Sequence, residues 1–449
     1  MSRLEDTTAV IGMGQTGQSV VRFLQSAQIP CEGHDENPCE LPPDLNVPLH
    51  IGSLDGKKIS QYKQAVVSPG IPWTHPALRV ARQNGLEMNG DLALFVEHYQ
   101  GDILAVTGTN GKTTTVSLIT LLLETLPGGI ECGGNTGTPM LNLLAMEPVP
   151  PRVVLELSSF QLERTPKVRP RLAVLLNVQP DHADMHEDHH QYAQAKLSLF
   201  AQQGQGDIAL LPLDKQWNVL ANELQEKGAT VQRFGWVTDS DNAAAGLLST
   251  NGDQYIFWHQ NDRIQTVNTK NLKIRGSYQY INLAIAAQAA AQFGVSSTVI
   301  RESIISFQGL PHRLQSLGVH ADREWIDDSK ATNPAAAMAA LGEFENVIWI
   351  CGGLPKELDL MPMQKVVKAR VRQAFVIGKN TKPFEALLRQ SGVPATCAGS
   401  IGKAVDLAAS EAPCPVLLSP AAASQDQFRN YVQRGQAFAK AVAGLETRH

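Results

Sequence analysis

The sequence predicts an α/β protein with mostly parallel sheets, divided into three domains. Short apolar runs, many of them rich in β-branched residues, end abruptly in Gly, Ser, Asn or Pro, as at residues 9–12, 103–108, 172–177 and 347–353. Helical stretches, such as residues 112–125, lie between many of these runs. Runs that are apolar on both faces suit buried parallel strands, and their alternation with helices implies right-handed crossovers. A chain of 449 residues is also too long for one ordinary core.

The strand-like runs fall into three blocks, which we place at residues 1–91, 92–295 and 296–449. The first block carries one Gly-rich turn, and the second opens near Ile103 with a different Gly-rich loop. The third follows an alanine-rich helix that ends near Val295. In parallel sheets ligands bind at the carboxyl ends of the strands, so the polar ends of these runs are the places to look for chemistry.

Composition excludes several classes of protein. Hydrophobic residues make up 43% and charged residues 18%, as in folded globular proteins. A formal charge of -5 gives no bulk attraction to nucleic acid or to an anionic membrane, so we expect neither partner. Six scattered cysteines without CxxC spacing indicate reduced thiols, and no apolar run is long enough to cross a bilayer. We expect a cytoplasmic protein and a monomer.

The first candidate site is the Gly-rich turn Gly12-Met-Gly14-Gln-Thr-Gly17, which follows a strand and opens a helix. Glycine lets the backbone approach a diphosphate, and the helix start offers free N–H groups. Asp35, eighteen residues beyond Gly17, stands where an acidic side chain can meet a ribose or a base. A nicotinamide dinucleotide and a UDP group both satisfy this pattern, and a tight turn that binds nothing is the alternative.

The second candidate site is the phosphate loop, residues 107–115, with the sequence TGTNGKTTT. Lys112 can reach the β- and γ-phosphates of a nucleotide, and Thr113 can ligate Mg²⁺. The spacing G-x-x-G-K-T is shorter than the usual P-loop signature, but strand, Gly-Lys-Thr and helix occur together. Two nucleotide-type loops in one chain predict two nucleotide ligands, one of them ATP.

Three further features of the middle block offer metal or substrate ligands. Glu156 follows a strand directly, where a carboxylate can hold Mg²⁺, although a lone strand-end Glu is more often a surface residue. Residues 186–190 match the zinc-protease pattern H-E-x-x-H, which we reject because the surroundings are acidic and polar. His182 is the better contact, and Lys196 taken alone is a surface lysine.

The third block offers polar residues at several strand ends and loops. None is decisive alone, but together they predict a charged, polar face: Arg313, Asp328, Lys330, Thr332, Asn333, Ser419 and Ser424.

Ten segments in order resemble the Mur ligase family, and most closely its D-glutamate-adding members. They cover nearly the whole chain and are GMGQTG, VSPGIP, TGTNGKTTT, GGNTGTP, LELSSFQLE, NVQPDH, QYAQAK, GLPHR, DDSKATN and LLSPAAASQDQF. LELSSFQLE and LLSPAAASQDQF carry the resemblance to the D-glutamate adder, and the D-N-P-R segment of the diaminopimelate-adding relatives is missing.

The resemblance implies a ligase that uses ATP to join D-glutamate to UDP-N-acetylmuramoyl-L-alanine through an acyl phosphate, in peptidoglycan precursor synthesis. It implies a Rossmann-like N-terminal domain for the UDP group, a central P-loop ATPase domain, and a Rossmann-like C-terminal domain for the amino acid. The implied cofactors are ATP and Mg²⁺, the latter as two ions, and both partners are small-molecule substrates.

The resemblance also implies a role for each site residue. The catalytic group is Lys112, Glu156, His182 and Lys196. ATP would contact Gly108, Thr109, Asn110, Gly111, Lys112, Thr113, Thr114, Asn282, Arg313 and Asp328. The UDP substrate would contact Gly14, Gln15, Thr16, Gly17, Asp35, Ser68, Pro69, Gly70, Asn135 and His182. D-Glutamate would contact Lys330, Thr332, Lys356, Ser419 and Phe428. The metal ligands would be Thr113, Glu156, His182 and a carbamylated Lys196, in which a cation becomes a carboxylate-like ligand.

Two segments depart from the family pattern. Tyr278 and Gln279 stand where many members have His-Asn, although Asn282 is retained. GGLPKELD replaces the usual Gly-Gly-Asp-Gly-Lys, with Lys356 still in place.

Three alternative functions remain open at this point. The nearest is another Mur-type ligase or a folylpolyglutamate-type ligase, because these share the ATP loop. A nicotinamide-dependent dehydrogenase would use the Gly-rich turn but leaves Lys112 unexplained. A non-catalytic nucleotide switch would bind ATP without consuming an amino acid.

Overall fold

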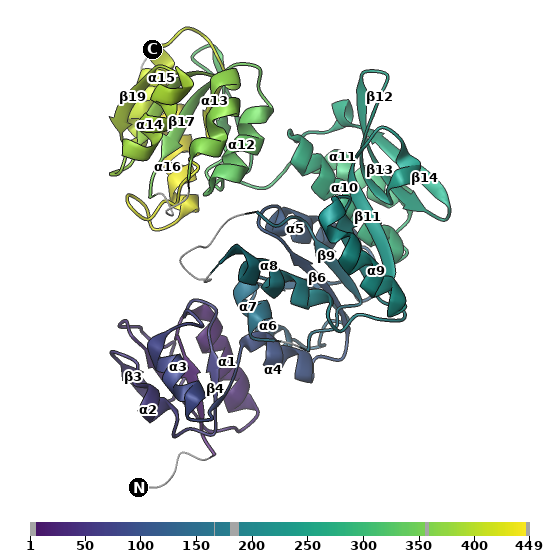
Figure 1. Ribbon diagram of the computed structural model, residues 1–449, viewed down its shortest axis with the longest axis vertical. Helices are drawn as coiled ribbons and strands as arrows, with labels where there is room; N and C mark the ends of the chain where they lie inside the picture. Colours follow the sequence, from purple (N-terminus) through teal and green to yellow (C-terminus); the bar gives the residue numbers. More distant parts are fainter. Residues whose placement is uncertain (1–5, 166, 180–187, 355–358, 446–449) are drawn as a thin grey trace.

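The protein is described by a computed structural model that covers residues 6–165, 167–179, 188–354 and 359–445. Three separate sheets follow one another along the chain, each flanked by helices (Figure 1). Most strand pairs are parallel, so the predicted α/β class is confirmed.

The N-terminal sheet has five parallel strands in the order β3-β2-β1-β4-β5. Its strands are β1 (Thr8–Ile11), β2 (Cys31–Asp35), β3 (Leu49–Ile51), β4 (Gln64–Val67) and β5 (Glu87–Asn89). Its helices are α1 (Gln15–Ser26), α2 (Gly56–Ile59), α3 (Pro76–Gln83) and α4 (Asp91–His98). The order turns back at β1, which places the Gly-rich turn between the ends of β2 and β4.

The middle sheet has nine strands in the order β14-β13-β12-β11-β10-β9-β6-β8-β7. Its pairings are parallel except for β12–β13 and β13–β14 at one edge, which are antiparallel. Its strands are β6 (Asp102–Thr107), β7 (Glu131–Gly134), β8 (Arg152–Glu156), β9 (Leu172–Leu175), β10 (Ile208–Pro212), β11 (Thr230–Val237), β12 (Ala245–Thr250), β13 (Asp253–Gln260) and β14 (Arg263–Asn268). Its α-helices are α5 (Lys112–Leu123), α6 (Met140–Leu143), α7 (Ser159–Glu163), α8 (His189–Leu197), α9 (Asn218–Glu226), α10 (Ser277–Gln292) and α11 (Ser297–Ser306).

The C-terminal sheet has six strands in the order β15-β16-β20-β17-β18-β19, with an antiparallel edge pair β15–β16. Its strands are β15 (Gln315–His320), β16 (Arg323–Asp327), β17 (Val347–Gly352), β18 (Val371–Ile377), β19 (Ala395–Gly399) and β20 (Val416–Leu418). Its α-helices are α12 (Pro334–Gly342), α13 (Gln364–Arg370), α14 (Lys382–Ser391), α15 (Ile401–Ser410) and α16 (Tyr431–Ala443).

Packing joins the N-terminal unit to the middle unit and holds α11 against the middle unit. Apolar side chains of α1, α4 and α6 share one core, so the N-terminal and middle sheets meet through a buried interface. Ile300 and Ile304 of α11 pack in the same core as α10 of the middle unit. The domain limits that we placed after residues 91 and 295 stay a prediction. Within the described residues, no helix is long and apolar enough to cross a membrane.

Candidate active site

The carboxyl ends of three neighbouring strands meet at one edge of the middle sheet. Val106 of β6 pairs with Glu156 of β8 on one side and with Val174 of β9 on the other. The phosphate loop, Glu156 and the segment that follows β9 therefore emerge side by side, as the strand-end rule predicts.

The phosphate loop has the conformation that an anion site needs. Gly111 is left-handed, with φ +92°, and α5 begins directly after it at Lys112. A Cβ at Gly111 would also come within 2.9 Å of Asn282 Oδ1, so a larger residue would have to displace this side chain of α10 as well as adopt a strained backbone. Because α5 begins at the end of the loop, its first N–H groups are free to donate to a phosphate bound there.

Lys112 lies back over the loop that carries it. Its Nζ donates to the carbonyl of Gly108 at 2.7 Å and to that of Thr109 at 2.9 Å. The ammonium group is therefore held at the position that the β- and γ-phosphates of a nucleotide would approach.

Asn177 and Gln179 stabilise the conformation of the phosphate loop, and the sequence alone predicted no role for them. Asn177 Oδ1 accepts from the N–H of Asn110 at 2.9 Å, and Asn177 Nδ2 donates to the Asn110 carbonyl at 3.0 Å. Gln179 Oε1 accepts from Asn110 Nδ2 at 3.1 Å. Both residues follow β9 (Leu172–Leu175), and ligands of a parallel sheet bind where its strands end. Their position after a strand was therefore the signal that could have found them.

Glu156 is buried, with 2% of its surface exposed, so the alternative that it is a surface residue is wrong. Its Oε1 accepts from Asn135 Nδ2 at 3.1 Å. Its Oε2 is buried and accepts no hydrogen bond from any residue that the structure describes. A buried, unpartnered carboxylate oxygen is a costly arrangement unless a ligand or ion completes it. Asn135, predicted to contact the acceptor, lies here and positions this carboxylate.

Lys196 is also buried, at 1% exposure, so the alternative of a surface lysine is wrong. Its Nζ donates to the Gly108 carbonyl at 3.0 Å and lies 4.4 Å from the centre of the Tyr192 ring. Lys196 and Lys112 thus share one loop carbonyl, which places the α8 lysine directly beneath the phosphate loop. Its carbamylation stays a prediction.

A cavity of about 330 Å³ opens over this edge and reaches the C-terminal unit. Most predicted ATP contacts line it, together with Asn135, Glu156 and two further residues of the third block, Lys330 and Thr332. The ATP contacts in its lining are Thr109, Asn110, Gly111, Lys112, Thr113, Thr114, Asn282, Arg313 and Asp328. Tyr278 and Gln279, the residues that depart from the family pattern, line it as well. Asn333 Nδ2 donates to Asn110 Oδ1 at 3.2 Å and so joins the C-terminal unit to the phosphate loop.

Asp328 and Ser419 meet because β16 and β20 are neighbours and each residue follows its strand. Ser419 Oγ donates to Asp328 Oδ2 at 2.8 Å, and the N–H of Leu314 donates to Oδ1 at 3.2 Å. Burial raises the pKa of Asp328 to about 7, although these hydrogen bonds oppose the shift. The carboxyl group can therefore change protonation when a charged ligand arrives.

Lys330 lies against Tyr431, with Nζ 3.9 Å from the ring centre. Phe428, predicted to contact D-glutamate, packs beside the core of the C-terminal sheet, and its role stays a prediction. Tyr431, for which the sequence predicted no role, is the aromatic ring that Lys330 contacts.

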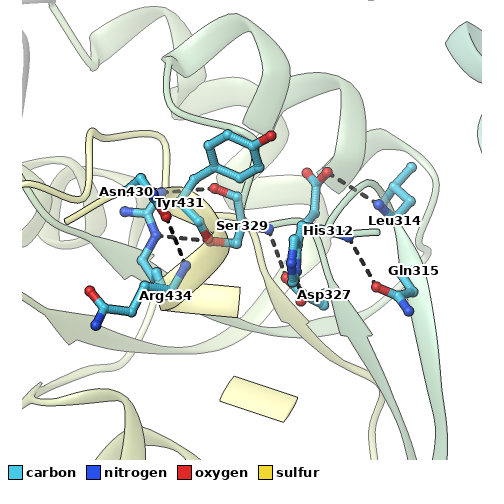
Figure 2. A network of polar contacts seen from close by, with 10 residues as sticks. His312, Leu314, Gln315, Asp327, Ser329, Asn430, Tyr431 and Arg434 are labelled. Carbon is cyan, nitrogen blue, oxygen red and sulfur yellow. Dashed lines mark hydrogen bonds and ion pairs between the residues drawn. The ribbon is translucent and has the colours of Figure 1, made fainter. Parts of the chain in front are cut away.

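A buried polar network supports the segment that carries Asp328 and Lys330 (Figure 2). His312 Nδ1 lies 2.6 Å from Asp327 Oδ2. Arg434 donates from Nε to Ser329 Oγ at 3.0 Å and from Nη2 to the Ser329 carbonyl at 2.8 Å. Because Ser329 stands between Asp328 and Lys330, these bonds fix the backbone from which both side chains extend.

The N-terminal turn is built as predicted. The N–H of Met13 donates to Asp35 Oδ2 at 2.7 Å, and Ser68 Oγ donates to the carbonyl of Gly12 at 2.6 Å. The ends of β2 and β4 thus hold the turn from both sides. Gln15 is exposed and Thr16 partly exposed at the start of α1, where a diphosphate could reach them.

Two predicted residues, His182 and Lys356, lie outside the described residues. Of the predicted metal ligands, Thr113 and Glu156 both line the cavity, and Glu156 keeps an unpartnered oxygen. A hydroxyl and a carboxylate are oxygen donors of the kind that Mg²⁺ prefers, so Thr113 and Glu156 fit the ion.

Comparison with known proteins supports the family. Residues 106–290 match the Mur ligase middle domain, and residues 6–90 match the Mur ligase MurD-like N-terminal domain. UDP-N-acetylmuramoylalanine–D-glutamate ligase from Agrobacterium fabrum is 33% identical, covering 98% of this chain and 95% of its own. The enzyme of that name from Zymomonas mobilis is 35% identical, covering 98% and 97%.

Solved structures show the same fold at low identity. UDP-N-acetylmuramate-alanine ligase from Thermotoga maritima aligns with a TM-score of 0.60 and 16% identity, covering 98% of this chain and 99% of its own. MurF ligase from Thermotoga maritima, solved in complex with ADP, aligns with a TM-score of 0.60 and 15% identity over the full length of both chains. The domain matches and the full-length relatives together show that this chain belongs to the Mur ligase family of ATP-dependent amide ligases.

Proposed function

We propose that this enzyme joins D-glutamate to UDP-N-acetylmuramoyl-L-alanine at the expense of ATP. One observation carries the proposal: a single cavity collects the phosphate loop, a carboxylate with an unpartnered oxygen, and charged groups of the third sheet. The names of the full-length relatives support the choice of substrates. A likeness to folylpolyglutamate synthase from Mycobacterium tuberculosis, with a TM-score of 0.55 and 16% identity, concerns the fold alone.

A carboxylate does not form an amide with an amine directly, because its oxygen is a poor leaving group, so the carboxylate must first be activated. An oxygen of the alanine carboxylate attacks the γ-phosphorus of ATP, and ADP departs. The amine of D-glutamate then attacks the acyl carbon, loses a proton, and expels inorganic phosphate as the amide forms. Each step moves negative charge, so preorganised cations and dipoles are the main means of catalysis available to the protein.

Lys112 and the start of α5 would bind the β- and γ-phosphates. The lysine would exchange its bonds with loop carbonyls for bonds with phosphate oxygens. Arg313 also lines the cavity. Burial lowers the pKa of Arg313, and the nearby Glu156 carboxylate opposes this shift. Its guanidinium group would neutralise charge on the transferring phosphoryl group.

Thr113 and Glu156 would hold Mg²⁺, which supplies positive charge beside the phosphates when it is bound. A second ion shared with His182 and a carbamylated Lys196 belongs to the same proposal. Lys330 and Lys356 would bind the carboxylates of D-glutamate, with hydrogen bonds from Thr332 and Ser419. The Gly-rich turn, Asp35 and residues 68–70 would bind the UDP group.

We further propose a reducing, cytoplasmic setting, supported by six free cysteines. We also propose a monomer as the active form.

The test is phosphate release with UDP-N-acetylmuramoyl-L-alanine while the amino acid is varied. We expect rapid release with D-glutamate and little with L-glutamate, lysine or diaminopimelate. Equal release with diaminopimelate or lysine would reassign the enzyme within the family. Release that needs no amino acid would favour a nucleotide switch.

A further inference from the structure

A cluster of metal-ligating side chains lies in the N-terminal unit, apart from the cavity described above. Glu32, His34 and His50 each offer a ligand atom, and these atoms all lie within 4.8 Å of one another. In the part of the chain that the structure describes, no other three His, Cys, Asp or Glu side chains converge in this way.

The strand register creates the cluster. Glu32 and His34 are two residues apart on β2, so they extend from the same face of the sheet. His50 of β3 is the parallel partner of His34, and the two imidazole rings stack with centres 4.7 Å apart. The three side chains are therefore placed by regular strand geometry on two paired strands, which gives the positional precision that a metal site needs.

Short polar contacts join the side chains of the cluster. His50 Nε2 lies 2.8 Å from Glu32 Oε2, and Tyr62 OH donates to the same oxygen at 2.5 Å. His34 Nε2 lies 3.0 Å from Tyr62 OH. Two Nε2 atoms and one carboxylate oxygen thus lie close together, and the phenol of Tyr62 contacts both Glu32 and His34.

We propose that Glu32, His34 and His50 bind a divalent transition metal of the zinc class. Two imidazoles with one carboxylate are a common protein ligand set for such ions, whereas Mg²⁺ and Ca²⁺ favour all-oxygen sites. Tyr62 would remain hydrogen-bonded to Glu32 and orient its carboxylate, as outer groups do in metal sites. The His50 side chain is 53% exposed, which leaves a route for the ion and room for His50 to close on it.

The ion would link the edge strand β3 to β2, immediately before Asp35. Asp35 is the residue whose carboxylate holds the Gly-rich turn through the N–H of Met13. The proposed site is therefore structural, and none of its three ligands is among the residues predicted to bind the UDP group.

The experiment is Zn²⁺ binding to the metal-free full chain in the presence of saturating Mg²⁺, measured by equilibrium dialysis with metal analysis. Glu32→Gln and His50→Gln each remove one ligand, and His98→Gln removes an exposed histidine outside the cluster. Because other histidines of the chain can also bind zinc, the comparison between variants is the measurement.

We expect the wild type and His98→Gln to bind one more Zn²⁺ than Glu32→Gln and His50→Gln. The affinity of this site should fall by more than the roughly 100-fold that outer-shell changes produce. Zn²⁺ should also raise the thermal unfolding midpoint of the wild type, and this rise should shrink in both cluster variants. Equal stoichiometry and affinity in all four proteins would overturn the proposal and leave a hydrogen-bonded cluster only.

Discussion

Glu156 has one carboxylate oxygen bonded to Asn135 and another that no described residue bonds, in a side chain that is 2% exposed. The substitution Glu156→Gln keeps the shape and an oxygen for Asn135 but removes the charge. We expect phosphate release to fall by about 100-fold or more, the scale at which single preorganised groups act in catalysis. The loss should lessen as the Mg²⁺ concentration is raised.

The thermal unfolding midpoint of Glu156→Gln should be no lower than that of the wild type. This result follows because the variant no longer buries a carboxylate with an unpartnered oxygen. Glu131→Gln, at an exposed position on the neighbouring strand β7, is the matched control and should retain full activity. Undiminished turnover in Glu156→Gln would remove this carboxylate from the mechanism.

Asp91 gives a prediction about stability and pH. It is fully buried at the start of α4, and burial raises its pKa from 3.8 to about 6, against a hydrogen bond from Gln161 and the charge of Arg164. Because the pKa of Asp91 is higher in the folded protein than in the unfolded chain, the protonated carboxyl group stabilises the fold. This contribution to the free energy of unfolding is complete below pH 4 and is lost as the pH rises through 6. The lost contribution is about 3 kcal/mol.

The variant Asp91→Asn lacks this titration. The free energy of unfolding of the variant, relative to the wild type, should therefore rise by about 3 kcal/mol between pH 4 and pH 7. Denaturant unfolding followed across this pH range measures the difference. A difference that stays constant with pH would show that Asp91 does not titrate as its burial implies.

At the scale of elements, α7 joins the two candidate sites. Glu156 ends β8, Ser158 caps α7, and Arg164 follows that helix directly. Arg164 is 2% exposed, and its guanidinium donates to the carbonyls of Val67, at 3.1 Å, and of Ser68, at 2.5 Å, and to that of Ile71. The segment that carries Glu156 therefore also clamps the loop predicted to hold the UDP group.

Removing the clamp should weaken binding of the UDP substrate. We expect Arg164→Ala to raise KM for that substrate by about 10- to 100-fold, because hydrogen bonds from a charged group are worth about 1.5–3 kcal/mol. KM for ATP should change far less. Arg169→Ala, which removes a largely exposed arginine paired with Asp207, is the control. An unchanged KM for the UDP substrate in Arg164→Ala, with the fold intact, would contradict the clamp.

Strand ends could be predicted from the sequence, and contacts between distant segments could not. The phosphate loop, Glu156 and Asp35 follow apolar runs, and parallel strands bring such ends to one edge. Arg164 has no such signal, because its partners lie nearly a hundred residues earlier in the chain. The contact between Lys330 and Tyr431 depends on how α16 begins, which local pattern does not fix.

At the scale of the whole molecule, the cavity exists only because separate units approach one another. Asn333 of the C-terminal unit bonds Asn110 of the phosphate loop, and Glu343 accepts from the N–H of Ser277 at the start of α10 at 2.8 Å. The three-domain α/β class followed from length and from the alternation of strands and helices. The distances between the units could not be predicted from the sequence, because they depend on how side chains from the three sheets meet.

The central claim is that the γ-phosphoryl group of ATP passes to the carboxylate of the UDP substrate. The most direct test uses acceptor labelled with oxygen-18 in its alanine carboxylate, with D-glutamate and ATP, and mass spectrometry of the released phosphate. One labelled oxygen should appear in the phosphate for each amide formed, because the attacking oxygen leaves with phosphorus. Amide formation that yields unlabelled phosphate would contradict the acyl-phosphate route.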